Sequence, residues 1–126
     1  KSGYAKHFDC STKSMSELGA LEWLRSKDYR ERVLTVILYL NDPCWRPLHV
    51  SDMTHRLNMN DERGDGGELR VYHCDGGQET YIDVIPRGGT LIIFDSRRIE
   101  HEVLPSRQDR FALTCWINGK VAVASV

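Results

Sequence analysis

The decapeptide RVLTVILYLN, residues 32–41, is dominated by β-branched and large apolar side chains and is followed by turn residues. Such a run is typical of a β-strand, which we predict over residues 33–40. Four more segments share this composition, and two shorter ones show it more weakly. The four are residues 68–73, 80–85, 90–94 and 110–117, and the two are residues 4–9 and 101–104.

The segments between these strands are rich in turn residues. Asp-Gly-Gly occurs at residues 65–67 and 75–77, and Pro-Arg-Gly-Gly occurs at residues 86–89. Glycine and proline supply the positive or fixed φ angles that tight turns require. Many short strands separated by such turns predict a mostly β domain, either a sandwich or a barrel.

A single helix is expected between the first two strands. Ser14 and Glu17 have the spacing of a capping box, in which each side chain bonds the other residue's backbone. Leucines at positions 18, 21 and 24 follow at helical intervals. We therefore predict one helix over residues 14–27, with this leucine stripe packed on the sheet.

Residues 42–64 are polar and aperiodic, which predicts a loop. A loop of this length in a compact domain is usually either functional or disordered. It contains His49 and His55, whose spacing with His73 fits no common metal-site template. We interpret these three histidines as solvated side chains.

The length and composition of the chain limit its class. Its 126 residues, 40% of them hydrophobic, suffice for one domain, which we place at residues 1–126. Lys and Arg total 17 against 18 Asp and Glu, so no overall field attracts nucleic acid or an anionic membrane. No apolar run approaches the roughly 18 residues of a membrane span. The abrupt start, without Met, leads us to expect a piece of a longer protein.

The spacing of the cysteines favours reduced thiols over disulfides. They are scattered without any Cys-x-x-Cys pair, which argues against a zinc knuckle or a thioredoxin-like motif. Two disulfides in an oxidising compartment are the alternative. The compartment therefore stays open, with cytoplasm or nucleus favoured because other secretory signs are missing.

His7-Phe8-Asp9 places two potential metal ligands two residues apart, and on a strand such residues point to the same face. His101 is the best third ligand, because the first and last strands of a closed double-sheet fold can lie side by side. Two histidines and one carboxylate form a facial triad that leaves iron positions open. The His-x-Asp pattern alone also occurs by chance, and a lone histidine is more often a surface residue than a ligand.

Arg110 adds a second signal, nine residues after His101 and at the start of an apolar strand. A guanidinium that enters an apolar barrel needs a partner. A dicarboxylic acid that binds iron with one end would offer its other carboxylate to this bidentate fork. The alternative is a salt bridge to Asp109, Glu100 or another acid.

Five stretches together resemble a known family. They are YAKHFD at residues 4–9, RVLTVILYLN at 32–41, GGELRVY at 66–72, HEVLP at 101–105 and RFALT at 110–114. Their order and the nine-residue spacing from His101 to Arg110 are similar to those of the prolyl 4-hydroxylase-like iron(II)- and 2-oxoglutarate-dependent dioxygenases. Within that family the chain looks most like the oxygen-sensing prolyl hydroxylases. The resemblance implies a double-stranded β-helix, or jelly roll, with one inserted helix, and it places the first core strand before Lys1.

The resemblance also implies a role for each site residue. It makes His7, Asp9 and His101 the ligands of iron(II). It makes Arg110 the clamp for 2-oxoglutarate, assisted by the Tyr39 hydroxyl. The residues that would line the cosubstrate pocket are Ile37, Leu69, Val103 and Thr114, and Trp116 would border the site on the substrate side. For the two aromatic residues the alternative is ordinary core packing, and Cys10 is interpreted as a packing residue.

The implied reaction is hydroxylation of a prolyl residue in a protein or peptide, with release of succinate and carbon dioxide and with ascorbate as the reductant. The helix at residues 14–27 and the loop at 42–64 depart from the family pattern. We expect them to flank the mouth of the site and select the peptide, and peripheral decoration is the alternative.

Two other classes of function stay open. One is a related dioxygenase that acts on a lysyl residue, a small molecule or an alkylated base. The other is a β-domain that kept the fold and lost catalysis, against which the presence of all three ligands and the arginine argues.

Overall fold

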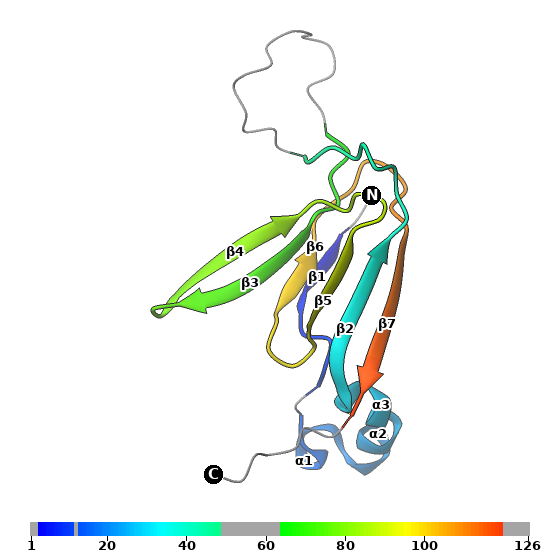
Figure 1. Ribbon diagram of the computed structural model, residues 1–126. Coiled ribbons are helices and arrows are strands. Elements are labelled where there is room, and N and C mark those ends of the chain that lie inside the picture. Colours follow the sequence, from blue (N-terminus) through cyan, green and yellow to red (C-terminus); the bar gives the residue numbers. More distant parts are fainter. Residues whose placement is uncertain (1–2, 12, 49–63, 120–126) are drawn as a thin grey trace, which may run out of the picture.

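The computed structural model describes residues 3–11, 13–48 and 64–119, which form seven strands and three short helices (Figure 1). The strands are β1 (Tyr4–His7), β2 (Arg32–Tyr39), β3 (Leu69–Asp75), β4 (Gln78–Val84), β5 (Leu91–Asp95), β6 (His101–Val103) and β7 (Ala112–Asn118). The helices are α1 (Met15–Leu18), α2 (Ala20–Arg25) and α3 (Lys27–Arg30). All seven predicted strands are confirmed, with ends within two residues of the prediction.

The strands form two antiparallel sheets that face each other. One sheet has the order β1-β6-β3-β4 and the other has the order β5-β2-β7. Every connection between consecutive strands crosses from one sheet to the other, except the β3–β4 hairpin, which extends beyond the body of the domain. This is a double-sheet jelly roll, as the sequence predicted.

The inward face of β2 forms the centre of the interior. Its residues alternate, so that Thr35, Ile37 and Tyr39 are buried while their neighbours are only half-buried. Ile37 and Tyr39 pack with Leu69 of β3 across the two sheets. The apolar core is therefore small, and much of what surrounds it is polar. The buried polar residues are Asp9, Thr35, Asn41, Glu68, Ser96, His101 and Ser106.

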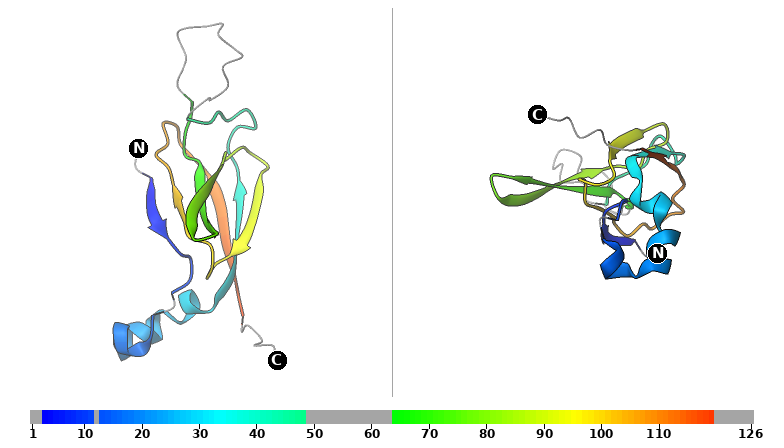
Figure 2. Two further views of the ribbon diagram at one scale, coloured as in Figure 1. Left: turned by 90° about the vertical axis from the view of Figure 1, so that its left-hand side faces the viewer. Right: turned by 90° about the horizontal axis from the view of Figure 1, so that it is seen from below.

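The single helix predicted over residues 14–27 is wrong. Its capping box forms, with the Glu17 carboxylate accepting a bond from the Ser14 backbone at 2.7 Å. Gly19 then adopts a φ of +80°, which ends α1 after one turn and separates it from α2. The leucine stripe does not pack on the sheet, because Leu21 and Leu24 are both 64% exposed. Figure 2 shows the helices gathered at one end of the sheets.

The described residues test some of the predictions about the cysteines, the membrane and the remaining histidines. All four cysteines are free. The described part of the chain contains no helix that is long and apolar enough to cross a membrane. Most of the predicted 42–64 loop, with His49 and His55, lies outside the described residues. The third of these histidines, His73, is exposed and lies 2.8 Å from the Thr80 hydroxyl.

Asn41 ties together three segments at the end of β2. Its side-chain NH₂ group donates to the Pro86 carbonyl at 2.7 Å, and its side-chain oxygen accepts from the Phe111 backbone N–H at 2.6 Å. Asn41 itself is 9% exposed. Its amide therefore connects the segments that lead into β5 and β7, which flank β2 in the sheet.

Replacing Asn41 with leucine is expected to lower the free energy of unfolding by about 2 kcal/mol, because the buried Pro86 carbonyl and the partly buried Phe111 N–H would lose their partners. Urea denaturation followed by circular dichroism measures this. The matched control is Asn118→Leu at the exposed end of β7, which should change the free energy by less than about 0.5 kcal/mol. Equal effects of the two substitutions would contradict the role given to Asn41.

Candidate metal centre

Two histidines from opposite ends of the chain meet through strand pairing. β1 pairs with β6, and His7 lies directly opposite His101. The two imidazole rings have a centroid separation of 4.5 Å. His101 is 4% exposed and also packs edge-on against Phe94, with ring centroids 4.8 Å apart. The predicted proximity of these two histidines is confirmed.

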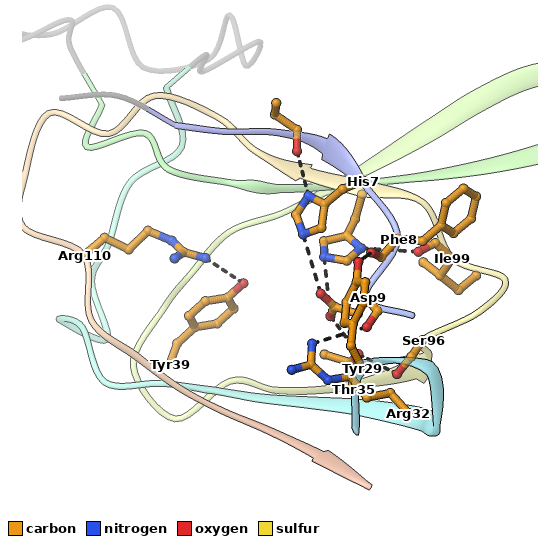
Figure 3. A network of polar contacts seen from close by, with 12 residues as sticks. His7, Phe8, Asp9, Tyr29, Arg32, Thr35, Tyr39, Ser96, Ile99 and Arg110 are labelled. Carbon is orange, nitrogen blue, oxygen red and sulfur yellow. Dashed lines mark hydrogen bonds and ion pairs between the residues drawn. The ribbon is translucent and has the colours of Figure 1, made fainter. Parts of the chain in front are cut away.

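Asp9 completes a cluster with these histidines. Its Oδ1 lies 3.5 Å from Nε2 of His7, and its Oδ2 lies 3.7 Å from Nε2 of His101 (Figure 3). One donor atom from each of the three residues lies within 4.8 Å of the other two, which is close enough for one metal ion to reach all three. The predicted convergence of the three residues is therefore confirmed.

Both histidines are oriented to present Nε2 to this point. Nδ1 of His7 lies 2.6 Å from the Ala5 carbonyl, and Nδ1 of His101 lies 3.3 Å from the Ile99 carbonyl. A carbonyl only accepts hydrogen bonds, so Nδ1 carries the proton and Nε2 keeps its lone pair. Burial lowers the pKa of His101, which favours the neutral imidazole that a metal binds. The donor set therefore fits a divalent transition metal.

Asp9 is not held by strand geometry, contrary to the prediction. β1 ends at His7, so Asp9 lies beyond the strand and the same-face argument does not apply to it. Neighbouring segments fix it instead. The Tyr29 hydroxyl donates to the Phe8 carbonyl at 2.7 Å, and Arg32 donates to the Asp9 carbonyl at 3.3 Å. Figure 3 shows Tyr29, Arg32 and Thr35 gathered beside Asp9.

The interpretation of Cys10 as a packing residue agrees with its burial. Cys10 is 5% exposed. Its thiol contacts the Arg30 carbonyl at 3.3 Å, so it links the segment after β1 to the end of α3. Cys10 does not belong to the cluster of metal donors.

Arg110 and Tyr39 form a second polar pair in the interior. Arg110 lies just before β7, and its Nε donates to the Gly67 carbonyl at 2.9 Å. Its NH2 donates to the Tyr39 hydroxyl at 3.1 Å, as Figure 3 shows. No ion pair joins Arg110 to a carboxylate in the part of the chain that the structure describes. The predicted contact with Tyr39 is confirmed, and the alternative of a salt bridge is not observed there.

Tyr39 stays protonated beside this cation. Its side chain is fully buried, and burial raises the pKa of its hydroxyl, with an opposing effect from Arg110. Because the hydroxyl oxygen accepts from Arg110, its own proton remains available for a further acceptor. The pair therefore offers guanidinium N–H groups and one O–H group to an anion.

Gly67 makes room for Arg110. Its φ of +75° favours glycine, and a Cβ atom there would lie 2.9 Å from Cδ of Arg110. The Asp-Gly-Gly turn at residues 65–67 therefore has a packing role as well as a turning role. Its second glycine lets the arginine lie against the backbone and donate to it.

The structure also locates the remaining predicted site residues. Ile37 is opposite Thr114 in one sheet, and Leu69 is opposite Val103 in the other. Ile37 and Leu69 are buried, and Thr114 and Val103 are half-buried. Trp116 is 40% exposed and lies opposite Thr35, with the Arg32 guanidinium 3.7 Å from its ring centroid. Both pairs thus line the interior, and Trp116 lies at its rim.

Sequence reasoning missed the residues that position Asp9. Tyr29 and Arg32 bond the backbone of residues 8 and 9, Thr35 bonds the Asp9 carboxylate at 2.7 Å, and Ser96 bonds Thr35 in turn. The sequence carried one signal for Thr35. It is separated from Ile37 and Tyr39 by an even number of positions, so it is a polar residue on the buried face of the strand. Tyr29, Arg32 and Ser96 carried no such signal, because their contacts depend on tertiary structure.

A jelly roll that brings two histidines and a carboxylate together in its interior is the arrangement of a non-haem iron(II) oxygenase. Comparison with known sequences agrees: the family model of the 2OG-Fe(II) oxygenase superfamily matches residues 1–118. The chain belongs to this superfamily.

Individual relatives are prolyl hydroxylases. A curated hypoxia-inducible factor prolyl hydroxylase of Caenorhabditis elegans is 44% identical over 57 residues, which are 44% of this chain and 8% of that protein. A solved prolyl-4-hydroxylase of Pseudomonas putida is 29% identical with a TM-score of 0.62, over 93% of this chain and 45% of that one.

A prolyl hydroxylase of Trichoplax adhaerens, solved with a hypoxia-inducible factor oxygen degradation domain peptide fragment, is 27% identical with a TM-score of 0.54. The match covers 90% of this chain and 36% of that one. This chain thus spans less than half the length of each of these three relatives.

The cluster is expected to bind a single divalent ion. In an anaerobic titration with iron(II) or cobalt(II), the unsubstituted protein should bind one equivalent. His7→Ala, Asp9→Ala and His101→Ala should each abolish binding at the same free metal concentration, because each removes one of three donors. His73→Ala is the control and should bind normally. Equal binding by all variants would place the metal elsewhere.

Proposed function

We propose that this chain is the catalytic core of an iron(II)- and 2-oxoglutarate-dependent dioxygenase that hydroxylates a prolyl residue in a protein or peptide. His7, Asp9 and His101 would hold the iron, and Arg110 with Tyr39 would hold the distal carboxylate of 2-oxoglutarate. The observation that carries the proposal is that one strand, β2, contacts both a cluster of metal donors and a cation without a described carboxylate partner.

The second carboxylate group of 2-oxoglutarate matches the donors that Arg110 and Tyr39 leave free. Arg110 uses one N–H for the Gly67 carbonyl and one for the Tyr39 hydroxyl. The remaining N–H groups form the planar fork that pairs with a carboxylate. The Tyr39 proton would add a third bond to the same group.

The proposed substrate rests on the relatives. The three proteins described above are prolyl hydroxylases, and one was solved with a peptide fragment. The near-neutral composition offers no support for an alkylated nucleic acid as the substrate. A prolyl residue in a peptide is therefore the substrate class that we favour.

When bound, iron(II) and 2-oxoglutarate would supply the oxidative chemistry: oxygen, 2-oxoglutarate and a substrate C–H bond would give succinate, carbon dioxide and a C–OH group, with one oxygen atom in succinate and one in the hydroxyl. Ascorbate would act as the reductant that keeps the iron as iron(II). The chain contributes orientation and exclusion of water. Nδ1 of each histidine is tied to a backbone carbonyl, so that Nε2 stays aimed at the ion. The side chains of Ile37, Leu69 and Val103 provide apolar walls. Such walls confine an oxidising centre and strengthen the ion pair at Arg110.

Arg110→Ala is expected to raise the concentration of 2-oxoglutarate needed for half-maximal turnover by about 30-fold or more, since loss of a charged partner costs roughly 2–5 kcal/mol. Succinate release from the purified protein, with iron(II), ascorbate and a proline-containing peptide, measures this. The Arg107→Ala control removes an exposed arginine and should leave the requirement unchanged. If mass spectrometry detects no oxidised peptide while succinate still forms, the prolyl substrate is rejected and the assignment as an oxygenase stands.

Trp116→Ala is expected to lower kcat/KM for the peptide about tenfold or more, because tryptophan is among the side chains that most often dominate binding of a protein partner. Succinate formation without peptide should persist, since Trp116 stacks on Arg32 and is not one of the metal donors. The control is Tyr81→Ala on β4, an exposed aromatic residue that also has an arginine, Arg70, stacked on it at 3.9 Å. Parallel loss of both activities would assign Trp116 to packing.

A further inference from the structure

A chain of two buried hydroxyl groups ends on the carboxylate of Asp9. Oγ1 of Thr35 donates to Oδ2 of Asp9 at 2.7 Å, and the Ser96 hydroxyl lies 2.8 Å from Oγ1 of Thr35. Thr35 and Ser96 are both 0% exposed, so water does not replace these bonds. Figure 3 shows Thr35 between Ser96 and Asp9.

The direction of each bond follows from the number of protons. An ionised carboxylate only accepts, so the single hydroxyl proton of Thr35 goes to Asp9. Thr35 must then accept from Ser96, whose proton points toward Oγ1. The Ser96 backbone N–H donates to the Val33 carbonyl at 2.9 Å, which anchors the start of this chain of bonds to β2. Hydrogen bonds in such a chain polarise and strengthen one another.

The two carboxylate oxygens of Asp9 therefore differ. Oδ2 accepts a hydrogen bond from Thr35, while Oδ1 lies 3.5 Å from Nε2 of His7. The hydrogen bond also fixes the rotation of the carboxylate, which the end of β1 leaves unconstrained. A carboxylate bound through both oxygens would occupy two metal positions, whereas one bound through Oδ1 alone occupies one.

We propose that Thr35, oriented by Ser96, is a positioning residue that restricts Asp9 to one-oxygen metal binding and so keeps a metal position open. This inference rests on the proposed function, since it concerns the same metal centre. Thr35 touches neither the metal nor a substrate in this role. It acts through Asp9 alone, by occupying the second oxygen.

The test uses cobalt(II), whose visible spectrum reports coordination number and geometry, in the purified protein. Thr35→Val keeps the branched shape and removes the donor. It should weaken cobalt(II) binding by about 10- to 100-fold, as loss of an outer-shell partner typically does. It should also change the visible bands, because the released carboxylate can bind through both oxygens. Thr35→Ser should restore both properties.

Ser96→Ala provides a second, milder variant if Thr35→Val does not fold. It should shift the cobalt(II) spectrum in the same direction by a smaller amount, because Thr35 keeps its bond to Asp9 and loses only its orientation. Thr80→Val on β4 is the matched control, and it should leave the affinity and the spectrum unchanged. Thermal melting of the metal-free variants separates loss of stability from loss of metal geometry.

The outcomes separate this inference from the proposed function. If Thr35→Val and Ser96→Ala lower only the stability of the metal-free protein, with cobalt(II) affinity and spectrum unchanged, the hydroxyl pair merely satisfies a buried carboxylate and the inference is overturned. If the unsubstituted protein itself binds no metal, the proposed function fails. Changed spectra in both variants, with rescue by Thr35→Ser, support the positioning role.

Discussion

The pairing of β1 with β6, which sets His7 opposite His101 after a register shift that follows Tyr4, is the constraint on which the metal centre depends. Side chains alternate along a strand, so a slip of one residue would turn a histidine to the outer face. His7 and His101 face each other only in the observed register. β3 holds β6 from its other side, with Val71 opposite His101. The central strands of this sheet thus fix a site whose donors come from opposite ends of the chain.

β2 supplies the facing wall and connects the two polar parts of the interior. Thr35 contacts the carboxylate of the metal cluster, Tyr39 contacts Arg110, and Ile37 lies between them on the same face. At about 3.3 Å per residue, Thr35 and Tyr39 are roughly 13 Å apart along the strand. Both residues lie on the buried face of β2, so this interval separates the metal cluster from the Arg110–Tyr39 pair along one strand.

Patterns local in the sequence predicted most of the fold, and tertiary contacts account for the rest. Short β-branched runs between glycine turns predicted every strand, and the family resemblance placed Arg110 beside Tyr39. The helix prediction failed because Gly19 leaves helical geometry and no sheet surface covers the leucines that follow. The placement of Asp9 was predicted for the wrong reason, since Thr35 and its neighbours hold it rather than a strand. Ser96 was not predictable, because its role exists only once β5 lies beside β2.

The surroundings of Arg110 support the proposed binding of a dicarboxylate. Arg110 is half-buried, and the partners of its guanidinium, the Gly67 carbonyl and the Tyr39 hydroxyl, are both neutral. Removing part of a charged group from water costs free energy when its partners are neutral. An anion that enters the interior restores this lost interaction, in surroundings where apolar walls reduce screening. Among the described residues no carboxylate pairs with Arg110, and the proposed cosubstrate would supply one while its other end reaches the metal.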